Sequence, residues 1–452
     1  MRIGISAMVL ACCAACAANA REEVSRDFNK SVPLAPGRSL RVEHSQGSVS
    51  IHTQAKPEVD IRASIKCSSG RAQDAHAICD GIKISVDETG AGVSVRTEFP
   101  RISGIFHNLS WSVDLDIVMP DTAPLELRNQ FGTVSVTDLH APADIRDSSG
   151  KVSFTGGRGK QRIETSFGDI ELARNDGDVT LIDSSGRVTA SDVTGELDVR
   201  DNFGEIKISN IGKRLEIRSG SGNVSVAGVA GVATISDSFG KVTVRDARSD
   251  VSVQNQSGDV ETAGIAGTAD LRTTFGAVRF SRIGKGATVH AESSQVTGDT
   301  VDGPVTVETT FGGIDVHTIK GGARLTAQSA PIRASDVGGE VYAKTSFAGV
   351  TVEDVAQPIT VDNQSGSVTV RAKASNKCQP ISLSTTFGPI KVVLPQGAGY
   401  DVTARTSFGH ISSEAPMTVS GQVGDQSISG KIGGGGCSLR LIDQSGNIDI
   451  LK

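Results

Sequence analysis

A sequence motif such as DSFGKVTVRD, residues 237–246, recurs at a constant spacing along most of the chain. When the copies are aligned on the residue after their Phe or Ser, fourteen markers follow one another at steps of 18 residues. The markers are Gly132, Gly150, Gly168, Gly186, Gly204, Gly222, Gly240, Gly258, Gly276, Ser294, Gly312, Ala330, Ala348 and Gly366. A unit this short cannot bury its own apolar side chains, so the repeat predicts stacked coils rather than separate globules.

Three aliphatic columns accompany the markers. The residue two after the marker is Val or Ile in every copy, and the residues seven and thirteen after it are mostly aliphatic, as in Ile211 and Ile217. Polar residues alternate with them, which is typical of strands, and 52 Gly against two Tyr and one Trp suit short strands joined by tight turns. We therefore predict an all-β chain that forms a right-handed parallel β-helix or β-solenoid with 18-residue coils, capped at both ends. A coil of 36 residues is the alternative.

The residue before the marker alternates between Phe and Ser, which gives a 36-residue superperiod. Neighbouring coils lie about 4.7 to 4.9 Å apart, so an interior has little room for a ring on every level. We predict that the rings point inward and alternate with Ser as a structural core ladder. The predicted ladder consists of Phe131, Phe167, Phe203, Phe239, Phe275, Phe311 and Phe347.

Loss of the repeat near both ends predicts four segments. Residues 1–20 are expected to be a signal peptide, and 21–130 an N-terminal β-rich cap with one short helix at RAQDAHAICD, residues 71–80. The regular β-solenoid repeats are expected over 131–374, followed by C-terminal coils and a cap over 375–452.

The first twenty residues carry one Arg, an apolar run and the small-residue ending Ala18-Asn19-Ala20. This pattern predicts cleavage and export to the periplasm, the outer surface or the medium of a bacterium. A lipid anchor at Cys12, within VLAC, is the alternative. No other stretch is apolar enough for a transmembrane span.

Four cysteines remain after the signal sequence. An even number in an exported chain favours disulfides, and sequence proximity suggests Cys67 with Cys79 and Cys378 with Cys437. Free buried thiols are the alternative. A zinc site is disfavoured because no ligand spacing accompanies these cysteines.

Charge and motifs limit the functions. The net charge of -6 is slight, and the two signs are interspersed, so nucleic acid is not an expected partner. Polar residues three before the marker suggest side chains that cap turns rather than a calcium site. We find no catalytic motif and predict no catalytic, cofactor-binding or metal-binding residues.

The opening LRVEHSQGSVSIHTQAKPEVDIRASI, the reiterated S-G-x-V-x-V units and the ending GKIGGGGCSLRLIDQSGNIDI carry a resemblance to a known family. The chain resembles bacterial candidate adhesins that carry a β-strand-repeat domain of unknown function. The resemblance implies an exported β-helical or β-solenoid protein and supplies no catalytic residues.

We therefore expect a non-catalytic envelope or surface protein, an adhesin-like binding or scaffold module. Outward rows rich in Ser and Thr, such as Thr189, Ser225 and Thr243, would face a glycan, a cell-wall polymer or an envelope protein. The alternatives are a polysaccharide-active β-helix lyase or hydrolase, and a structural or stress-response component of the envelope.

Overall fold

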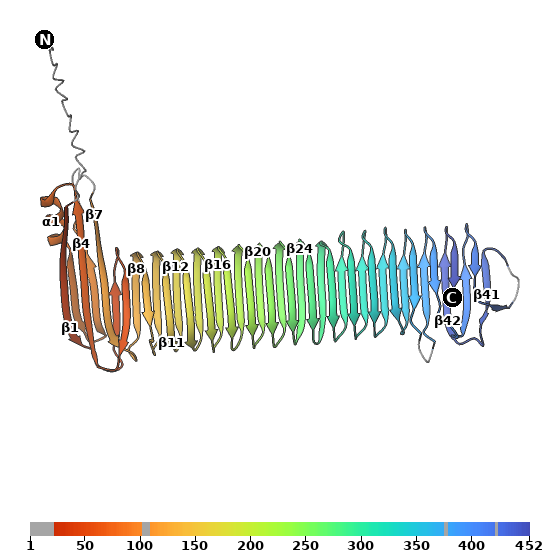
Figure 1. The fold of residues 1–452 in the computed structure, drawn as a ribbon, viewed down its shortest axis with the longest axis horizontal. Helices are drawn as coiled ribbons and strands as arrows, with labels where there is room; N and C mark the ends of the chain where they lie inside the picture. Colours follow the sequence, from red (N-terminus) through yellow and green to blue (C-terminus); the bar gives the residue numbers. More distant parts are fainter. Residues whose placement is uncertain (1–21, 102–108, 375–377, 421–423) are drawn as a thin grey trace, which may run out of the picture. The chain divides into compact units, whose positions relative to one another are not determined.

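The computed structural model describes residues 22–101, 109–374, 378–420 and 424–452, and its chain divides into two compact units (Figure 1). The first unit runs to Ser135 and the second starts at Val136. The expected signal peptide, its cleavage site and the alternative lipid anchor at Cys12 lie outside the described residues.

The first unit combines long antiparallel strands with shorter parallel ones. Its elements are β1 (Glu22–Pro33), β2 (Ser39–Glu43), β3 (Val49–Gln54), β4 (Glu58–Ser69), α1 (Ala72–Gly81), β5 (Lys83–Thr89), β6 (Gly92–Glu98), β7 (Ser110–Pro120) and β8 (Leu125–Phe131). Strand β4 pairs antiparallel with β1 and β7, while β2 pairs parallel with β6 and β8. The expected short helix is present as α1, and a disulfide between Cys67 of β4 and Cys79 of α1 fastens it to the sheet.

The second unit is a stack of coils with two main strands each. We call the two faces the even sheet and the odd sheet, after the strand numbers, and β9 (Val134–Thr137) lies at the junction with the first unit. The even sheet contains β10 (Ala143–Ser149), β12 (Gln161–Phe167), β14 (Val179–Ser185), β16 (Leu197–Phe203), β18 (Leu215–Ser221), β20 (Ala233–Phe239), β22 (Val251–Ser257), β24 (Thr268–Phe275), β26 (Gly286–Ser293), β28 (Val305–Thr309), β30 (Ala323–Ala327), β32 (Val341–Thr345), β34 (Ile359–Asn363) and β36 (Ile381–Thr385). The odd sheet contains β11 (Val152–Arg158), β13 (Ile170–Asp176), β15 (Val188–Val193), β17 (Ile206–Ile211), β19 (Val224–Val229), β21 (Val242–Ala247), β23 (Val260–Ile265), β25 (Val278–Ile283), β27 (Val296–Val301), β29 (Ile314–Ile319), β31 (Ile332–Val337), β33 (Val350–Val355), β35 (Val368–Ala372) and β37 (Ile390–Val393).

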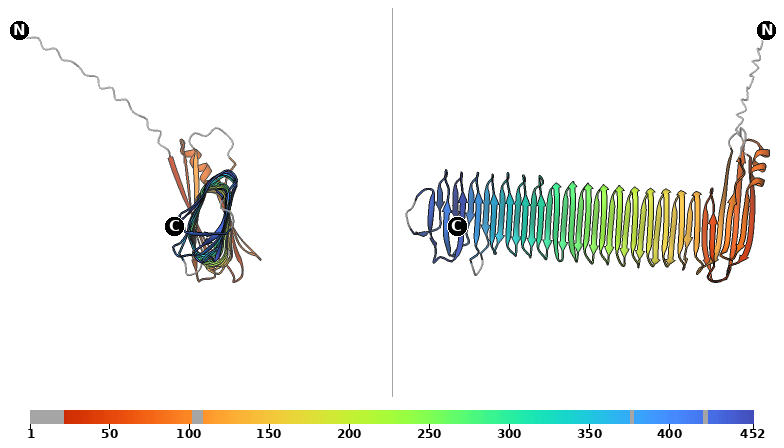
Figure 2. Two further views of the ribbon diagram at one scale, coloured as in Figure 1. Left: turned by 90° about the vertical axis from the view of Figure 1, so that its right-hand side faces the viewer. Right: turned by 180° about the vertical axis from the view of Figure 1, so that it is seen from behind.

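The register confirms the 18-residue coil and excludes the 36-residue alternative. Ile206 lies opposite both Val188 and Val224 in parallel neighbours, and Ile217 lies opposite Val199. The aliphatic residues of all three columns are buried, so the columns form apolar ladders along the inside of the coils. This is the right-handed parallel β-solenoid expected from the sequence. Seen along its axis, the second unit is a flattened loop whose coils superpose with little rotation (Figure 2).

A left-handed residue recurs six positions after the marker, where each coil bends. Its φ is 57° in both Asp192 and Asn210, and Gly occupies the same position in other coils, as at Gly228 with φ 72°. A short polar side chain or none suits this conformation. Most markers are Gly for a different reason: a Cβ on Gly240, for example, would lie 1.9 Å from the carbonyl oxygen of Gly222 in the preceding coil.

The predicted phenylalanine core ladder is wrong. In the first unit Phe131 is 56 % exposed. In the second unit the other predicted members are 54 to 66 % exposed: Phe167, Phe203, Phe239, Phe275, Phe311 and Phe347. The strand ends at the Phe and the chain turns at the following Gly, so the inward–outward alternation stops there. The corner is filled instead by the residue two before the Phe, as by Asp237, and the ring projects from the edge of the coil.

Among the described phenylalanines, Phe154 and Phe280 do lie in the core, at 0 % and 2 % exposure, and the ring of Tyr400 is buried as well. Phe280 lies opposite Gly298 in the next coil, and a Cβ on Gly298 would lie 2.2 Å from the ring. The small neighbour therefore makes the space for the large side chain.

The end of the second unit departs from chain order. Its strands are β38 (Tyr400–Arg405), β39 (Ile411–Ser413), β40 (Met417–Val419), β41 (Ser427–Ile432), β42 (Cys437–Asp443) and β43 (Ile448–Leu451). Strand β42 inserts between β36 and β38, and β43 inserts between β37 and β39. Strand β41 then pairs antiparallel with β38, and a disulfide joins Cys378 to Cys437. The antiparallel strand covers part of an otherwise open edge.

Candidate functional site

A row of polar side chains lies inside the second unit, three residues before most of the markers. All are buried at the corner where the even sheet ends: Asp147, Thr165, Asp183, Asp201, Ser219, Asp237, Asn255, Thr273, Thr309, Thr345 and Asn363. Asp183 Oδ1 accepts hydrogen bonds from the backbone N–H groups of Ser184 and Ser185, at 2.8 and 3.3 Å, and from Thr165 Oγ1 at 2.5 Å. Such bonds cap the turn that follows, as expected from the residue types.

Burial changes the acidity of these carboxyl groups. It raises the pKa of Asp183 and Asp237, against hydrogen bonds that favour the ionised form. Burial and the nearby charge of Asp183 raise the pKa of Asp201 to about 6. The acids of this row therefore resist ionisation chiefly because they are poorly solvated and, for Asp201, because the charge of Asp183 in the adjacent coil repels its own.

Among the described residues, no cluster of His, Cys, Asp or Glu is arranged to hold a metal ion. Within the same ranges, no helix has the length and apolarity that a membrane crossing requires.

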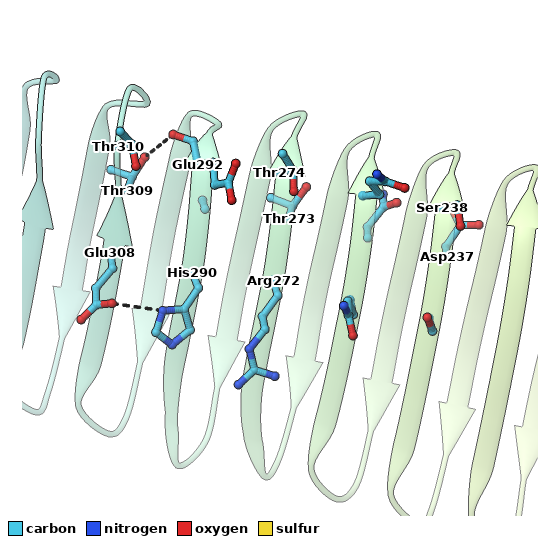
Figure 3. Close-up of a pocket in the computed structure, with 15 residues that line it drawn as sticks. Asp237, Ser238, Arg272, Thr273, Thr274, His290, Glu292, Glu308, Thr309 and Thr310 are labelled. Carbon is cyan, nitrogen blue, oxygen red and sulfur yellow. Dashed lines mark hydrogen bonds and ion pairs between the residues drawn. The ribbon is translucent and has the colours of Figure 1, made fainter.

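The outer face of the even sheet has a polar groove of about 630 Å³ that crosses five successive strands, β20 to β28 (Figure 3). One outward row supplies Ser236, Gln254, Arg272, His290 and Glu308, one residue from each strand. A second row, two residues further along each strand, includes Ser238, Thr274, Glu292 and Thr310. Since every coil contributes equivalent positions, the groove is a ladder of polar groups repeated at the strand spacing.

Two ion pairs lie in or beside the groove. His290 Nδ1 lies 3.2 Å from Glu308 Oε2 (Figure 3), and the guanidinium of Arg272 lies 2.9 Å from the carboxylate of Asp270 on the same strand. All four side chains are partly exposed. The groove can therefore offer hydrogen-bond donors and acceptors without a large field of either sign.

The buried acid of the groove is too far from the exposed glutamate for the two to form the carboxyl pair of a glycoside hydrolase. Asp237 lines it, but Asp237 is only 4 % exposed and lies three coils from Glu292. Three coils correspond to about 14 Å at ordinary strand spacing, beyond the roughly 6.5 to 9.5 Å that separates an inverting pair. The raised pKa of Asp237 thus reflects its place in the interior row.

The predicted Ser/Thr row and the predicted cysteines are not among the residues that line the groove. The expected Ser/Thr row is on the outer face of the odd sheet, where Thr189, Lys207, Ser225 and Thr243 follow one another in register. Both predicted disulfide pairs are present in the structure. Sequence reasoning missed the groove because its outward residues differ in type from coil to coil, so no motif signals them.

Parallel coils, aliphatic ladders and a two-strand repeat define the class of this chain as a β-solenoid repeat protein. The Toastrack DUF4097 family profile matches residues 212–451, more than half of the sequence, so the chain belongs to that family. No curated protein matches it. A crystal structure of a candidate cell adhesion protein from Clostridium sporogenes is similar over 94 % of this chain and 99 % of that one, at 9 % sequence identity and a TM-score of 0.17.

Proposed function

We propose that this protein is a non-catalytic, exported, adhesin-like binding module whose groove across β20 to β28 holds an extended, hydroxyl-rich polymer. The observation that carries the proposal is the repetition of polar side chains from five successive coils along one outer face. An extended polymer can contact the polar side chains of several successive coils at once, and each added contact is gained without a second association step.

The composition of the groove favours a glycan or cell-wall polysaccharide. Hydroxyl, amide, imidazole, guanidinium and carboxylate groups all line it, and five coils span about 19 Å at ordinary strand spacing. The two disulfides support export, because such bonds persist in oxidising compartments.

The test is binding of the purified chain, from residue 21 onward, to an array of bacterial and host glycans and to isolated cell-wall polysaccharide. We expect saturable binding that falls at least tenfold in a Gln254→Ala, Arg272→Ala double variant. The matched control is Arg200→Ala: Arg200 also pairs with an aspartate on its own strand, Asp198, at 2.9 Å, but lies outside the groove.

Equal loss of binding in the control and the double variant would reject the groove as the binding site. Absence of binding to every polysaccharide would reject the polymer ligand and favour a structural role in the envelope. Shortening of a bound polysaccharide over time would reject the non-catalytic assignment.

A further inference from the structure

The exposed rings of the second unit form one row along an edge, which we call the phenylalanine ridge. Its eight members are Phe167, Phe203, Phe239, Phe275, Phe311, Phe347, Phe387 and Phe408, and their exposed fractions run from 54 to 78 %. A Ser lies between successive rings: Phe203, Ser221, Phe239, Ser257 and Phe275 face one another in register from strand to strand. The ridge is therefore a regular series of large and small side chains at one-coil steps.

The alternation persists in space where the sequence repeat has ended. Ser365 bridges to Phe387 in the next coil. The coil after Phe387 is supplied by the inserted strand β42, and its turn places Ser445 there, with its backbone N–H bonded to Thr386. Phe408 follows, with its backbone N–H bonded to Gln444. The spatial alternation of Phe and Ser is thus kept where the strands no longer stack in the order of the chain. Duplication of an 18-residue repeat does not by itself explain this.

We propose that the phenylalanine ridge is an interface with a second copy of this chain, in which the rings of each copy insert over the serines of the other. The spacing of the rings indicates which partner the ridge binds. Only a surface with large and small groups at the same two-coil period can fill every gap, and a second copy supplies that period by construction.

The distances between rings along the ridge are compatible with interdigitation of two ridges. Rings on alternate coils are about 9.5 Å apart, so an inserted ring lies about 4.8 Å from each neighbour. This falls within the roughly 4.5 to 7 Å at which aromatic rings pair favourably. A Ser leaves the gap open, whereas a larger side chain would close it.

The area is sufficient for a stable dimer. A phenylalanine side chain has about 200 Å² to bury, so eight rings about 60 % exposed in each copy present roughly 1,900 Å² in total. Specific interfaces bury about 1,200 to 2,000 Å². A two-fold axis midway between a Phe coil and the neighbouring Ser coil would bring the ridges together antiparallel, with identical contacts in both copies.

Sedimentation equilibrium of the full chain from residue 21 tests the proposal over a range of protein concentrations. We expect the parent to be a dimer at micromolar concentration. A Phe203→Ser, Phe239→Ser, Phe275→Ser, Phe311→Ser variant should dissociate with a Kd raised at least about 100-fold, since central aromatic residues dominate such interfaces.

The discriminating variant fills the gaps. Ser221→Phe and Ser257→Phe together add apolar surface. Non-specific hydrophobic association would then become tighter, whereas interdigitation predicts that the variant is a monomer. Far-UV circular dichroism and thermal melting verify that each variant keeps the fold, because all the changed side chains lie outside the core. A parent that stays monomeric up to 100-fold above micromolar concentration, or a gap-filled variant that associates more tightly, would overturn the proposal.

Discussion

Phenylalanine occupies two environments in the second unit, and a pair of substitutions separates them. Phe280 is fully enclosed against Gly298, so Phe280→Ala should lower the free energy of unfolding by about 3 to 5 kcal/mol. Phe275 projects from the edge at 54 % exposure, so Phe275→Ala should change it by less than about 0.5 kcal/mol. Urea denaturation in dilute solution measures both, and equal losses would contradict the burial of one ring and the exposure of the other.

The interior acid Asp201 gives a pH dependence whose sign can be stated. Its pKa in the folded protein is about 6, above its ordinary value of 3.8, so the folded state binds the proton more tightly than the unfolded state. The free energy of unfolding should therefore fall as pH rises from about 4 to about 6. Asp201→Asn should flatten this slope and stabilise the protein at pH 7 by an amount on the order of 2 kcal/mol after solvent screening.

Asp250 is a control for which the pH dependence of the free energy of unfolding has the opposite sign. It accepts a hydrogen bond from the backbone N–H of Thr268, which lowers its pKa, so its ionised form stabilises the fold above its ordinary pKa. Asp250→Asn should weaken the protein at pH 7. Chemical denaturation of both variants from about pH 2 to 8 measures the two slopes, because the slope due to Asp250 lies at and below its ordinary pKa of 3.8. A shift of the same sign in both variants would refute the assignment.

At the residue scale the sequence predicted the aliphatic columns and missed the phenylalanine ridge, for one physical reason. Val and Ile at fixed positions within a strand keep the same side as long as the alternation continues, so Ile206 and Val224 are placed by the repeat alone. Phe239 stands at the last position of its strand, beside the turn. There the direction of a side chain depends on backbone dihedral angles that the alternation does not specify.

At the level of the element, the left-handed bend in each coil is the feature with a measurable cost. Thr318 adopts φ 57° there, and a β-branched side chain is poorly suited to that conformation. Thr318→Gly should raise the stability by about 1 kcal/mol, since glycine removes a strain of roughly 1 to 2 kcal/mol but makes the unfolded chain more flexible.

Asn210 is the matched position for this change, because it has the same φ and a side chain that tolerates it. Asn210→Gly should leave the melting temperature nearly unchanged or slightly lower. Thermal denaturation compares the two variants, and an equal effect at both positions would show that side-chain branching is not the source of the strain. The bend was not predictable from the sequence, because Asp, Arg, Asn, Thr and Gly all occupy it.

For the second unit as a whole, two deletions separate the core repeat from the surface repeat. Removing residues 241–258 deletes one coil, keeps the aliphatic columns and brings Phe239 next to Phe275 without a Ser between them. Removing residues 241–276 deletes two coils and keeps the alternation. Both proteins should fold, because each coil contacts only its neighbours.

Only the two-coil deletion should keep the association proposed for the phenylalanine ridge. Circular dichroism tests folding and sedimentation tests association. A one-coil deletion that dimerises as well as the parent would show that the phase of the rings does not matter.

The insertion of β42 and β43 beneath β38 and β39 has a consequence for biosynthesis. Strand β42, which comes later in the chain, must pair with β36 before the earlier strand β38 can stack on that end of the coils. Elongation at the ribosome can complete the preceding coils one after another, but β38 and β39 can stack only after β42 and β43 have been made. Until β42 has paired with β36, the edge of β36 remains open to other strands.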